Sequence, residues 1–303
     1  MAIVVSLGNV DHDLVQAALG SEHELIQEPT AEQLALAAGA IVRASFTVDK
    51  QMFARMPNLK ALARTGVGTE RVNLGEATRL GIPVLITPGS NTNAVAEGAL
   101  AMALHLSKRL APLTELVREG RWAERDSLPL GDIEGATFGI IGWGRIGRRL
   151  GGIVQAMGGN LLVFDAYAEV PDAIRADSIE HLIANSEIIS LHLPLTAENH
   201  GLFSTRLFTL MQPGTILLNC SRGPLIDLDA ALSALKSLNL GGLGLDVFDE
   251  EPPKFHPVFE HPNVVLTPHV MGLSKRAARQ TYIDAAVALR EVLAGQPARN
   301  AAN

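Results

Sequence analysis

Apolar and polar residues follow two alternating patterns along the chain: short apolar runs, and longer stretches with helical spacing. In the first 90 residues the apolar runs predict strands at Ile3–Ser6, Leu25–Gln27, Ile41–Arg43, Ala61–Ala63 and Val84–Thr87. Helices are predicted between them at Asp11–Leu19, Thr30–Ala38 and Asp49–Met56. Thr30 followed by Gln33 is typical of a capping box. Short strands separated by helices indicate a parallel sheet covered on both faces.

The second part of the chain repeats this layout after a long predicted helix at Ala94–Gly120 and a polar stretch to Gly131. Its predicted strands are Thr137–Ile141, Leu161–Phe164, Ile188–His192, Thr215–Asn219, Leu243–Asp246 and Val264–Thr267. A last helix is predicted at Ser274–Ala294. The 303 residues therefore form two α/β units, the second one larger, which agrees with the usual size of a domain.

Composition narrows the class of protein. Hydrophobic residues make up 47% of the chain, enough for buried cores, and the net charge of −7 argues against a nucleic-acid-binding surface. The single cysteine, Cys220, excludes an intrachain disulfide and a cysteine-rich zinc site, and we expect no metal. No apolar run is long enough to span a membrane, and MAIVVSLGN indicates a buried strand instead of a leader. We therefore expect a cytoplasmic protein.

The motif Gly142-x-Gly144-x-x-Gly147 lies between a predicted strand and a helical pattern. In a dinucleotide-binding fold the first glycine permits the tight turn, the second lets the backbone approach the pyrophosphate, and the third lets helix and strand pack closely. Asp165 ends the next strand, 18 residues after Gly147, where it can bind the ribose hydroxyls and repel a 2′-phosphate. The pattern predicts NAD in preference to NADP. Gly151-Gly152, inside the helix, is interpreted as a close-packing site against the sheet.

Three later strands end in residues that could carry chemistry, at the edge where open parallel sheets bind ligands. Arg222 follows one strand and could bind a carboxylate, with a surface ion pair as the alternative. Asp249–Glu251 follows the next, with a solvated loop as the alternative. His269 follows the third, where a structural histidine is the alternative. A histidine paired with a carboxylate, near a nicotinamide and an arginine, can transfer the proton while the cofactor moves a hydride.

Taken together, these stretches resemble the D-isomer-specific 2-hydroxyacid dehydrogenase family over essentially the whole chain. The matching stretches are Gly142–Gly147, Asp165, Asn219–Gly223, Asp246–Pro252, Thr267–His269, Arg64–Leu74 and Thr87–Glu97. The resemblance implies two doubly wound parallel-sheet α/β domains, a flavodoxin-like substrate domain and a Rossmann NAD-binding domain. The last helix would return to the first domain, so that residues 1–92 plus 279–303 form the substrate-binding domain and 93–278 the NAD-binding domain.

The family likeness also implies an NAD-dependent hydride transfer between nicotinamide and a small D-2-hydroxy acid or 2-keto acid. Arg222 would hold the substrate carboxylate and carbonyl oxygen, His269 would be the general acid or base, and Glu251 would accept a hydrogen bond from the far imidazole nitrogen. Backbone N–H groups near Val67 and Gly68 would hold the carboxylate. The positions that match NAD contacts are Thr87, Arg145, Ile146, Asp165, Leu193, Cys220, Asp246 and Gly272.

The substrate itself stays open between 3-phosphoglycerate, hydroxypyruvate or glyoxylate, and a lactate-like acid. Ser45, Phe46 and the turn Ser6–Asn9 are expected to face the substrate. Arg64 and Arg79 match positions that are basic in phosphoglycerate dehydrogenases, with ordinary surface ion pairs as the alternative. Two further readings are a phosphite-type dehydrogenase and an NAD(H)-sensing, corepressor-like binding protein. Formate oxidation is disfavoured, because such relatives carry Gln in place of Glu251.

The chain departs from the family pattern at a few positions. Gly98 stands where relatives often carry His, Glu70-Arg71 replaces the commoner Asp-Asn, and Met271–Ser274 replaces a small Gly/Ala-rich run after the histidine. These departures concern the shape of the pocket and leave the chemistry in place. The resemblance further implies a homodimer, built by the helix from Asn93 and the segment Trp122–Gly131, and no regulatory domain is expected after the second unit.

Overall fold

The computed structural model describes residues 1–303, which divide into two compact units. Unit 1 comprises Met1–Asn91 and Leu273–Asn303, and unit 2 comprises Thr92–Gly272. Each unit has one parallel sheet with helices on both faces, so the predicted fold class is confirmed. The divisions expected from the sequence, at 92/93 and 278/279, lie one residue and six residues further along the chain than those of the two units.

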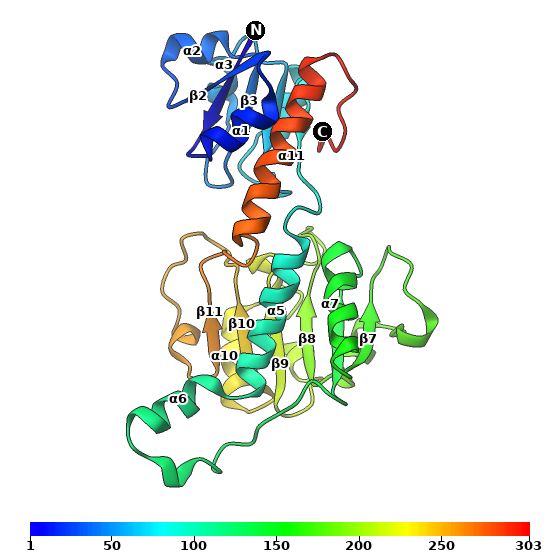
Figure 1. The fold of residues 1–303 in the computed structure, drawn as a ribbon. Coiled ribbons are helices and arrows are strands. Elements are labelled where there is room, and N and C mark those ends of the chain that lie inside the picture. The colour runs from blue at the N-terminus through cyan, green and yellow to red at the C-terminus, as the bar shows by residue number, and fades with distance from the viewer. The chain divides into compact units, whose positions relative to one another are not determined.

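The sheet of unit 1 has the strand order β2-β1-β3-β4-β5, which is the flavodoxin-like order (Figure 1). Its strands are β1 (Ala2–Leu7), β2 (His23–Gln27), β3 (Gly39–Val42), β4 (Ala61–Arg64) and β5 (Val84–Leu85). Its helices are α1 (His12–Leu19), α2 (Ala31–Leu36), α3 (Lys50–Ala54), α4 (Leu74–Arg79) and α11 (Lys275–Leu293). All four pairings are parallel, so every connection must cross a face of the sheet.

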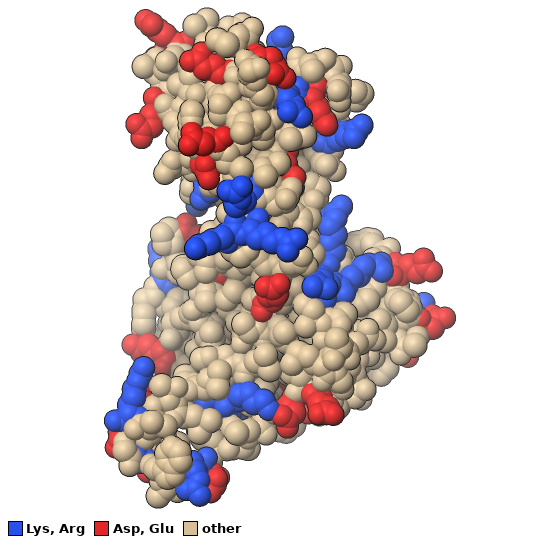
Figure 2. Space-filling view, in the orientation of Figure 1, with Lys and Arg blue, Asp and Glu red and all other residues tan.

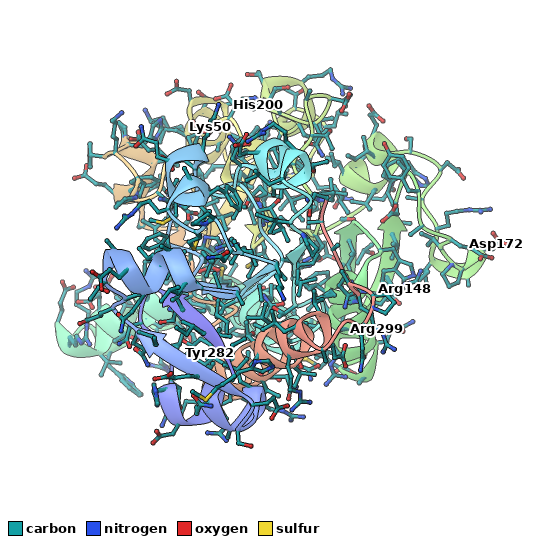
Figure 3. All side chains as sticks on the ribbon, turned by 90° about the horizontal axis from the view of Figure 1, so that it is seen from above. Lys50, Arg148, Asp172, His200, Tyr282 and Arg299 are labelled. Carbon is teal, nitrogen blue, oxygen red and sulfur yellow. The ribbon has the colours of Figure 1, made fainter.

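Two apolar cores lie on opposite faces of this sheet. α1 and α11 cover one face, and α2, α3 and α4 cover the other. Helix α11 packs so closely on β3 that a Cβ at Gly39 would lie 2.9 Å from a methyl group of Leu289. The Arg43 guanidinium lies 5.6 Å from the ring centre of Tyr282, which Figure 3 labels beside α11, and donates to its hydroxyl. The C-terminal segment is therefore an integral part of unit 1.

Unit 2 has a six-stranded sheet with the order β11-β10-β9-β8-β6-β7 (Figure 1). Its strands are β6 (Thr137–Ile141), β7 (Asn160–Phe164), β8 (Ile188–Leu191), β9 (Thr215–Asn219), β10 (Leu240–Leu245) and β11 (Val264–Leu266). Its α-helices are α5 (Thr92–Ser107), α6 (Leu110–Arg118), α7 (Arg145–Ala156), α8 (Ile179–Ala184), α9 (Thr205–Phe208) and α10 (Leu228–Lys236). A bridge between Val163 and Arg175 stands where a Rossmann sheet has its third strand, outside β7.

The core of unit 2 is also split by its sheet. Helices α5 and α7 pack on one face, and α8, α9 and α10 pack on the other. In Figure 1, α5 crosses in front of the sheet beside β9 and β10. The first half of α5 therefore lies near the segment that follows β11.

The long helix expected at Ala94–Gly120 is wrong, because two helices occupy this range. α5 ends at Ser107, Arg109 adopts a left-handed φ of 51°, and α6 starts at Leu110. A continuous helix would need an N–H at residue 112 to bond the carbonyl of residue 108, and Pro112 has none. α6 and the segment after it run away from the sheet of unit 2 (Figure 1).

Several helix starts follow the sequence closely. Thr30 and Gln33 form the expected capping box, in which each side chain bonds the backbone N–H of the other residue. Asp11 and Asp49 cap α1 and α3 through their carboxylates. No helix in the protein combines the length and the apolar character needed to cross a bilayer.

Candidate active site

The glycine motif forms the turn between β6 and α7, and its three glycines meet three different surroundings. Gly142 has φ 104°, and a Cβ there would lie 2.4 Å from the carbonyl oxygen of His192. A Cβ at Gly147 would lie 2.1 Å from the carbonyl oxygen of Gly142. At Gly144 it would meet no atom within 4 Å. The first and third glycines are therefore required by the protein itself, and the second leaves space for a ligand.

Helix α7 begins at this turn without closing its own N-terminus. Gly144 is the N-cap, and no side chain accepts a hydrogen bond from the first turn. The first turn has no acidic residue and carries Arg145. Free N–H groups, the positive end of the helix dipole and a basic side chain together suit the pyrophosphate of a dinucleotide. The residues present thus fit NAD.

Asp165, which follows β7, connects its own loop to the glycine turn by hydrogen bonds. Its carboxylate accepts hydrogen bonds from the backbone N–H of Trp143 at 2.6 Å and from those of Tyr167 and Ala168 at 2.8 Å. Burial alone would raise the pKa of Asp165, but these hydrogen bonds and the nearby Arg148 outweigh it and lower the pKa. The carboxylate is therefore charged at neutral pH, and an additional bond to a ribose stays a prediction.

The two glycines inside α7 differ. A Cβ at Gly151 would lie 2.8 Å from the ring of Trp143, so the interpretation as a close-packing site holds for this residue. Gly152 is exposed and a Cβ there would meet nothing within 4 Å, so the same interpretation is wrong for Gly152. The Trp143 ring is also covered by Arg148, labelled in Figure 3, whose guanidinium carbon lies 5.5 Å from the ring centre. A Cβ at Gly151 would also lie 3.1 Å from a methyl group of Leu161 in β7, so both the Trp143 ring and the sheet require the glycine at 151.

Glu251 and His269 are brought together by the loops that follow β10 and β11. The Nδ1 atom of His269 lies 2.8 Å and 3.0 Å from the two carboxylate oxygens of Glu251. Glu251 also accepts a hydrogen bond from the backbone N–H of Phe248 at 3.2 Å. Both side chains remain partly exposed, at 50% for His269 and 35% for Glu251. The pair leaves the Nε2 atom of the imidazole available to a substrate.

Arg222 follows the neighbouring strand β9 and is held by its own loop. The buried Asn219 side chain donates to the carbonyl of Arg222 at 2.8 Å and accepts from the N–H of Ser221 at 3.0 Å. A Cβ at Gly223 would lie only 1.9 Å from the carbonyl carbon of Phe248. The arginine loop and the loop that carries Glu251 are therefore in direct backbone contact, which sequence reasoning did not reveal.

Asp246, at the end of β10, organises the segment around the histidine. It is 2% exposed, and it accepts hydrogen bonds from the Thr267 hydroxyl at 2.6 Å, the Val270 N–H at 2.8 Å and the Met271 N–H at 3.1 Å. His269 itself has the left-handed φ of 53°. Such a φ is unfavourable for a non-glycine residue, so it must be held by its surroundings. The sequence placed Asp246 among the NAD contacts and missed this function.

Two other titratable groups near these strand ends are kept neutral by desolvation. Desolvation, together with the charge of Asp246, raises the pKa of the Cys220 thiol to about 12. The thiol therefore stays protonated at neutral pH and is not a nucleophile. Desolvation lowers the pKa of His192 to about 4, and its Nε2 lies 2.9 Å from the hydroxyl of Ser190. No group of three or more His, Cys, Asp and Glu side chains could hold a metal ion.

The remaining residues expected at the cofactor also lie at the ends of strands. Leu193 follows β8, Cys220 follows β9 and Gly272 ends the segment after β11. Ile146 lies in the first turn of α7. Their contacts with NAD stay predictions, as does that of Thr87, which is buried in unit 1.

Unit 1 contains the residues expected at the substrate. The turn Ser6–Asn9 and Phe46 line a pocket of about 410 Å³, together with Gln27–Pro29, Leu34, Met52 and Arg55. Ser45 does not line it. Val67 is 42% exposed and follows Gly66, whose φ is 139°. The structure thus groups Phe46 with the first turn and leaves the substrate contacts of Ser45, Val67 and Gly68 as predictions.

Arg64 and Arg79 have different environments. Arg79 makes the ordinary surface ion pair, with Glu76 at 2.6 Å. For Arg64 that alternative is wrong, because its side chain is buried and donates to the carbonyl of Gly68 at 2.7 and 2.9 Å and to that of Arg43 at 2.7 Å. Arg64 therefore holds the backbone of the Gly66–Gly68 turn.

Comparison with known proteins shows which family the chain belongs to. The profile described as "D-isomer specific 2-hydroxyacid dehydrogenase, NAD binding domain" matches residues 100–271, more than half of the chain. The chain belongs to the D-isomer-specific 2-hydroxyacid dehydrogenase family. Residues 100–271 cover the glycine turn, Asp165 and all three candidate catalytic side chains. They also cover nearly all of unit 2, which therefore carries the NAD-binding domain of that family.

Relatives in the family include several activities. D-3-phosphoglycerate dehydrogenase of Mycobacterium leprae is 35% identical over 297 residues, which cover 95% of this chain and 56% of that enzyme. Glyoxylate reductase of Thermococcus litoralis is 37% identical, over 77% of this chain and 73% of that enzyme. The structure of D-lactate dehydrogenase from Aquifex aeolicus with NAD and lactic acid has a TM-score of 0.84 at 25% identity, covering 97% and 96% of the two chains. The chain spans about half the length of the phosphoglycerate dehydrogenases that it matches.

Proposed function

We propose that this protein is an NAD-dependent dehydrogenase that interconverts a small D-2-hydroxy acid and the corresponding 2-keto acid. The observation that carries the proposal is the hydrogen bond between His269 and Glu251, beside the loop of Arg222 and at the same sheet edge as the open N-terminus of α7. A hydride-transfer enzyme needs a cofactor site, a group that binds the substrate's carboxylate and a group that moves a proton. Unit 2 supplies residues suited to all three.

The three side chains divide the chemistry. In the direction of reduction, the Arg222 guanidinium binds the carboxylate of the keto acid and polarises its carbonyl oxygen. His269, protonated at both ring nitrogens, donates its Nε2 proton to that oxygen. Glu251 keeps its hydrogen bond to Nδ1, so His269 is left neutral with a lone pair at Nε2, which accepts the hydroxyl proton in the reverse direction. When bound, NADH supplies the hydride that joins the carbonyl carbon.

The preference for NAD over NADP is supported by Asp165. Its pKa is lowered and it is charged at the end of β7, where a Rossmann fold places the adenosine ribose. A fixed carboxylate attracts the ribose hydroxyls and repels a 2′-phosphate. We assign this role to Asp165 in addition to the three backbone hydrogen bonds that it accepts.

The substrate-binding function is assigned to unit 1. The backbone N–H groups of Val67 and Gly68 hold the substrate carboxylate, supported by the buried Arg64, which fixes this turn through the Gly68 carbonyl. Ser45 is a further substrate contact. Because relatives include phosphoglycerate dehydrogenases and a glyoxylate reductase, the substrate is taken from 3-phosphoglycerate, hydroxypyruvate, glyoxylate and lactate-like acids.

A homodimer is supported by the arm of unit 2, defined as residues 109–131. Four large apolar side chains on it are each at least 49% exposed: Leu110, Val117, Trp122 and Leu130. Arginines lie among aspartate and glutamates on this arm, where Figure 2 shows both charge signs, so no single-sign charge opposes association. Contiguous exposed apolar patches mark interaction surfaces, and we assign these four side chains to such a patch at the dimer interface. Sedimentation velocity should show a dimer. The cytoplasmic location expected from the sequence stays a prediction.

The direct test is the oxidation of NADH and of NADPH by the purified protein with pyruvate, glyoxylate, hydroxypyruvate and 3-phosphohydroxypyruvate. One or more of these acids should be reduced, with NADH preferred. Replacing His269→Gln should lower kcat/KM by about 10²- to 10⁴-fold, which is the usual contribution of a general acid or base. The matched control is His200→Gln, an exposed histidine labelled in Figure 3, which should leave turnover unchanged.

The same experiment separates the alternatives. Reduction of NAD by phosphite, without turnover of any keto acid, would identify a phosphite-type dehydrogenase. Tight binding of NADH without turnover of any compound would identify a binding protein. Full activity of the His269→Gln variant would overturn the assigned mechanism.

A further inference from the structure

Two departures from the family pattern, Gly98 and Met271, meet in space within unit 2. Gly98 lies in the interior of α5 and is buried. A Cβ built on it would lie 2.4 Å from the sulfur of Met271, and 2.8 and 2.9 Å from its Cγ and Cβ. The Met271 side chain therefore occupies the space that any larger residue at 98 would need. The two positions are one matched pair.

The glycine is costly for the helix, which indicates that it is needed. Glycine in a helix interior is about 1 kcal/mol less favourable than alanine. Gly98 is flanked by Glu97 and Ala99, in a helix that is otherwise rich in alanine. Alanine at 98 would suit the helix better but would collide with the methionine. Met271 packs instead against the core beneath α5, with Ala99 and Met102 in the same cluster.

Met271 is two residues after His269, and the intervening chain is held from both sides. Asp246 accepts hydrogen bonds from the N–H groups of Val270 and Met271, which holds the backbone. The Met271 side chain is anchored on Gly98, which holds the same segment against α5. His269 has a left-handed φ of 53°, a conformation that persists only where surrounding contacts impose it.

We propose that Met271, anchored on Gly98, is a positioning residue that keeps the His269 imidazole on Glu251. The inference rests on the proposed function of His269 as the proton-transfer group. Without the Met271 side chain on Gly98, the segment after His269 is held by its backbone hydrogen bonds to Asp246 and can rotate about them. The imidazole then leaves the carboxylate for part of the time, and the active arrangement is populated less.

The test uses turnover and a signal from the ligand-free protein. Met271→Gly should lower kcat by about 10- to 100-fold, the scale of a misplaced catalytic group, while the KM of the keto acid and the affinity for NADH stay unchanged. Gly98→Ala should have a similar effect by displacing the methionine. Met271→Leu, which refills the space with a side chain of similar volume, should restore most of the activity.

The signal is the Nδ1 proton of His269 in spectra of ¹⁵N-histidine-labelled protein, assigned by its loss in His269→Gln. It should weaken in Met271→Gly and Gly98→Ala, because the bond to Glu251 protects that proton from exchange. The matched control is Gly152→Ala, a helix glycine with open space around it, which should change neither kcat nor the signal.

Each outcome decides the inference. If Gly98→Ala leaves kcat and the signal as in the wild type, the pair does not position His269. If Met271→Gly lowers the melting temperature and KM worsens while the signal persists, Met271 is only part of the core. Failure of the proposed function has a different signature, since His269→Gln would then remain active while the Nδ1 signal still responded to Met271→Gly.

Discussion

The first crossovers of the two units begin alike and end differently. In unit 1, β1 runs into Gly8 with φ 99°, where a Cβ would lie 2.8 Å from the Arg43 side chain. In unit 2, β6 runs into Gly142 with φ 104°, where a Cβ would lie 2.4 Å from the His192 carbonyl oxygen. Both strands therefore need a glycine with positive φ to turn toward the following helix.

The helices that follow differ at their N-termini. Helix α1 is capped by Asp11, whose carboxylate accepts from the Leu14 N–H at 3.1 Å, and its first turn carries Asp13. Helix α7 starts at Gly144 with no side-chain cap and carries Arg145. The same supersecondary unit is thus closed by its own carboxylate in one case and left open for an anion in the other. The fold supplies the turn, and the capping position decides whether it can bind a phosphate.

The largest expected difference between the units concerns acid stability, because His192 lies against the glycine turn of unit 2 only. Its pKa is about 4 when folded and 6.5 in its ordinary state. As the pH falls below 6.5, unfolded chains take up the proton and folded ones do not until about pH 4. The group therefore costs no stability above pH 6.5 and up to about 3 kcal/mol on acidification to pH 4.

Tryptophan fluorescence can measure this loss in unit 2 alone, since both tryptophans, Trp122 and Trp143, belong to it. Urea unfolding at about pH 7 and about pH 4.5 should show a smaller loss for His192→Gln than for the wild type. The exposed His200→Gln should behave as the wild type does. If the wild type and His192→Gln lost the same stability on acidification, His192 would not be the cause of the acid sensitivity of unit 2.

The next effect is on the open helix. Gly144→Asp should give α7 the kind of cap that α1 has, since its N-cap backbone, at φ −77° and ψ −162°, suits aspartate. The new carboxylate would bond the first-turn N–H groups and repel the pyrophosphate. We expect the Kd of NADH to rise about 100-fold, with no loss of stability.

A charge-matched control is Gly152→Asp, at an exposed position on the same helix. Fluorescence titration with NADH should show a small change for it. An unchanged Kd in Gly144→Asp would mean that the N-terminus of α7 does not hold the cofactor.

The fold was largely predictable because parallel strands buried on both faces appear as continuous apolar runs. β6 and β9 have the predicted bounds, Thr137–Ile141 and Thr215–Asn219. The break between α5 and α6 could also have been predicted, because Pro112 is incompatible with a continuous helix. It was missed because the apolar residues have helical spacing on both sides of the break.

The candidate site was predictable only as far as the ends of strands. Arg222, Glu251 and His269 each follow a strand, and neighbouring strands bring them together. The contacts of Gly223 with Phe248 and of Gly98 with Met271 join residues that are far apart in sequence. No periodicity or propensity encodes such contacts, because they depend on how two loops or a loop and a helix approach each other after folding. The buried environment of Arg64 was missed for the same reason.

The smallest expected effect tests the closed helix. Asp11→Ala removes the acceptor of the Leu14 N–H and should lower the free energy of unfolding by about 1 kcal/mol, measured by thermal unfolding with circular dichroism. Asp13→Ala removes a charge from the same helix without removing the cap, so it should cost less. NADH affinity should change in neither variant. Uncapping α1 also should not create a pyrophosphate site, because Asp13 remains in its first turn. If Asp11→Ala bound pyrophosphate, an open helix end alone would be sufficient, and the basic first turn of α7 would lose its assigned importance.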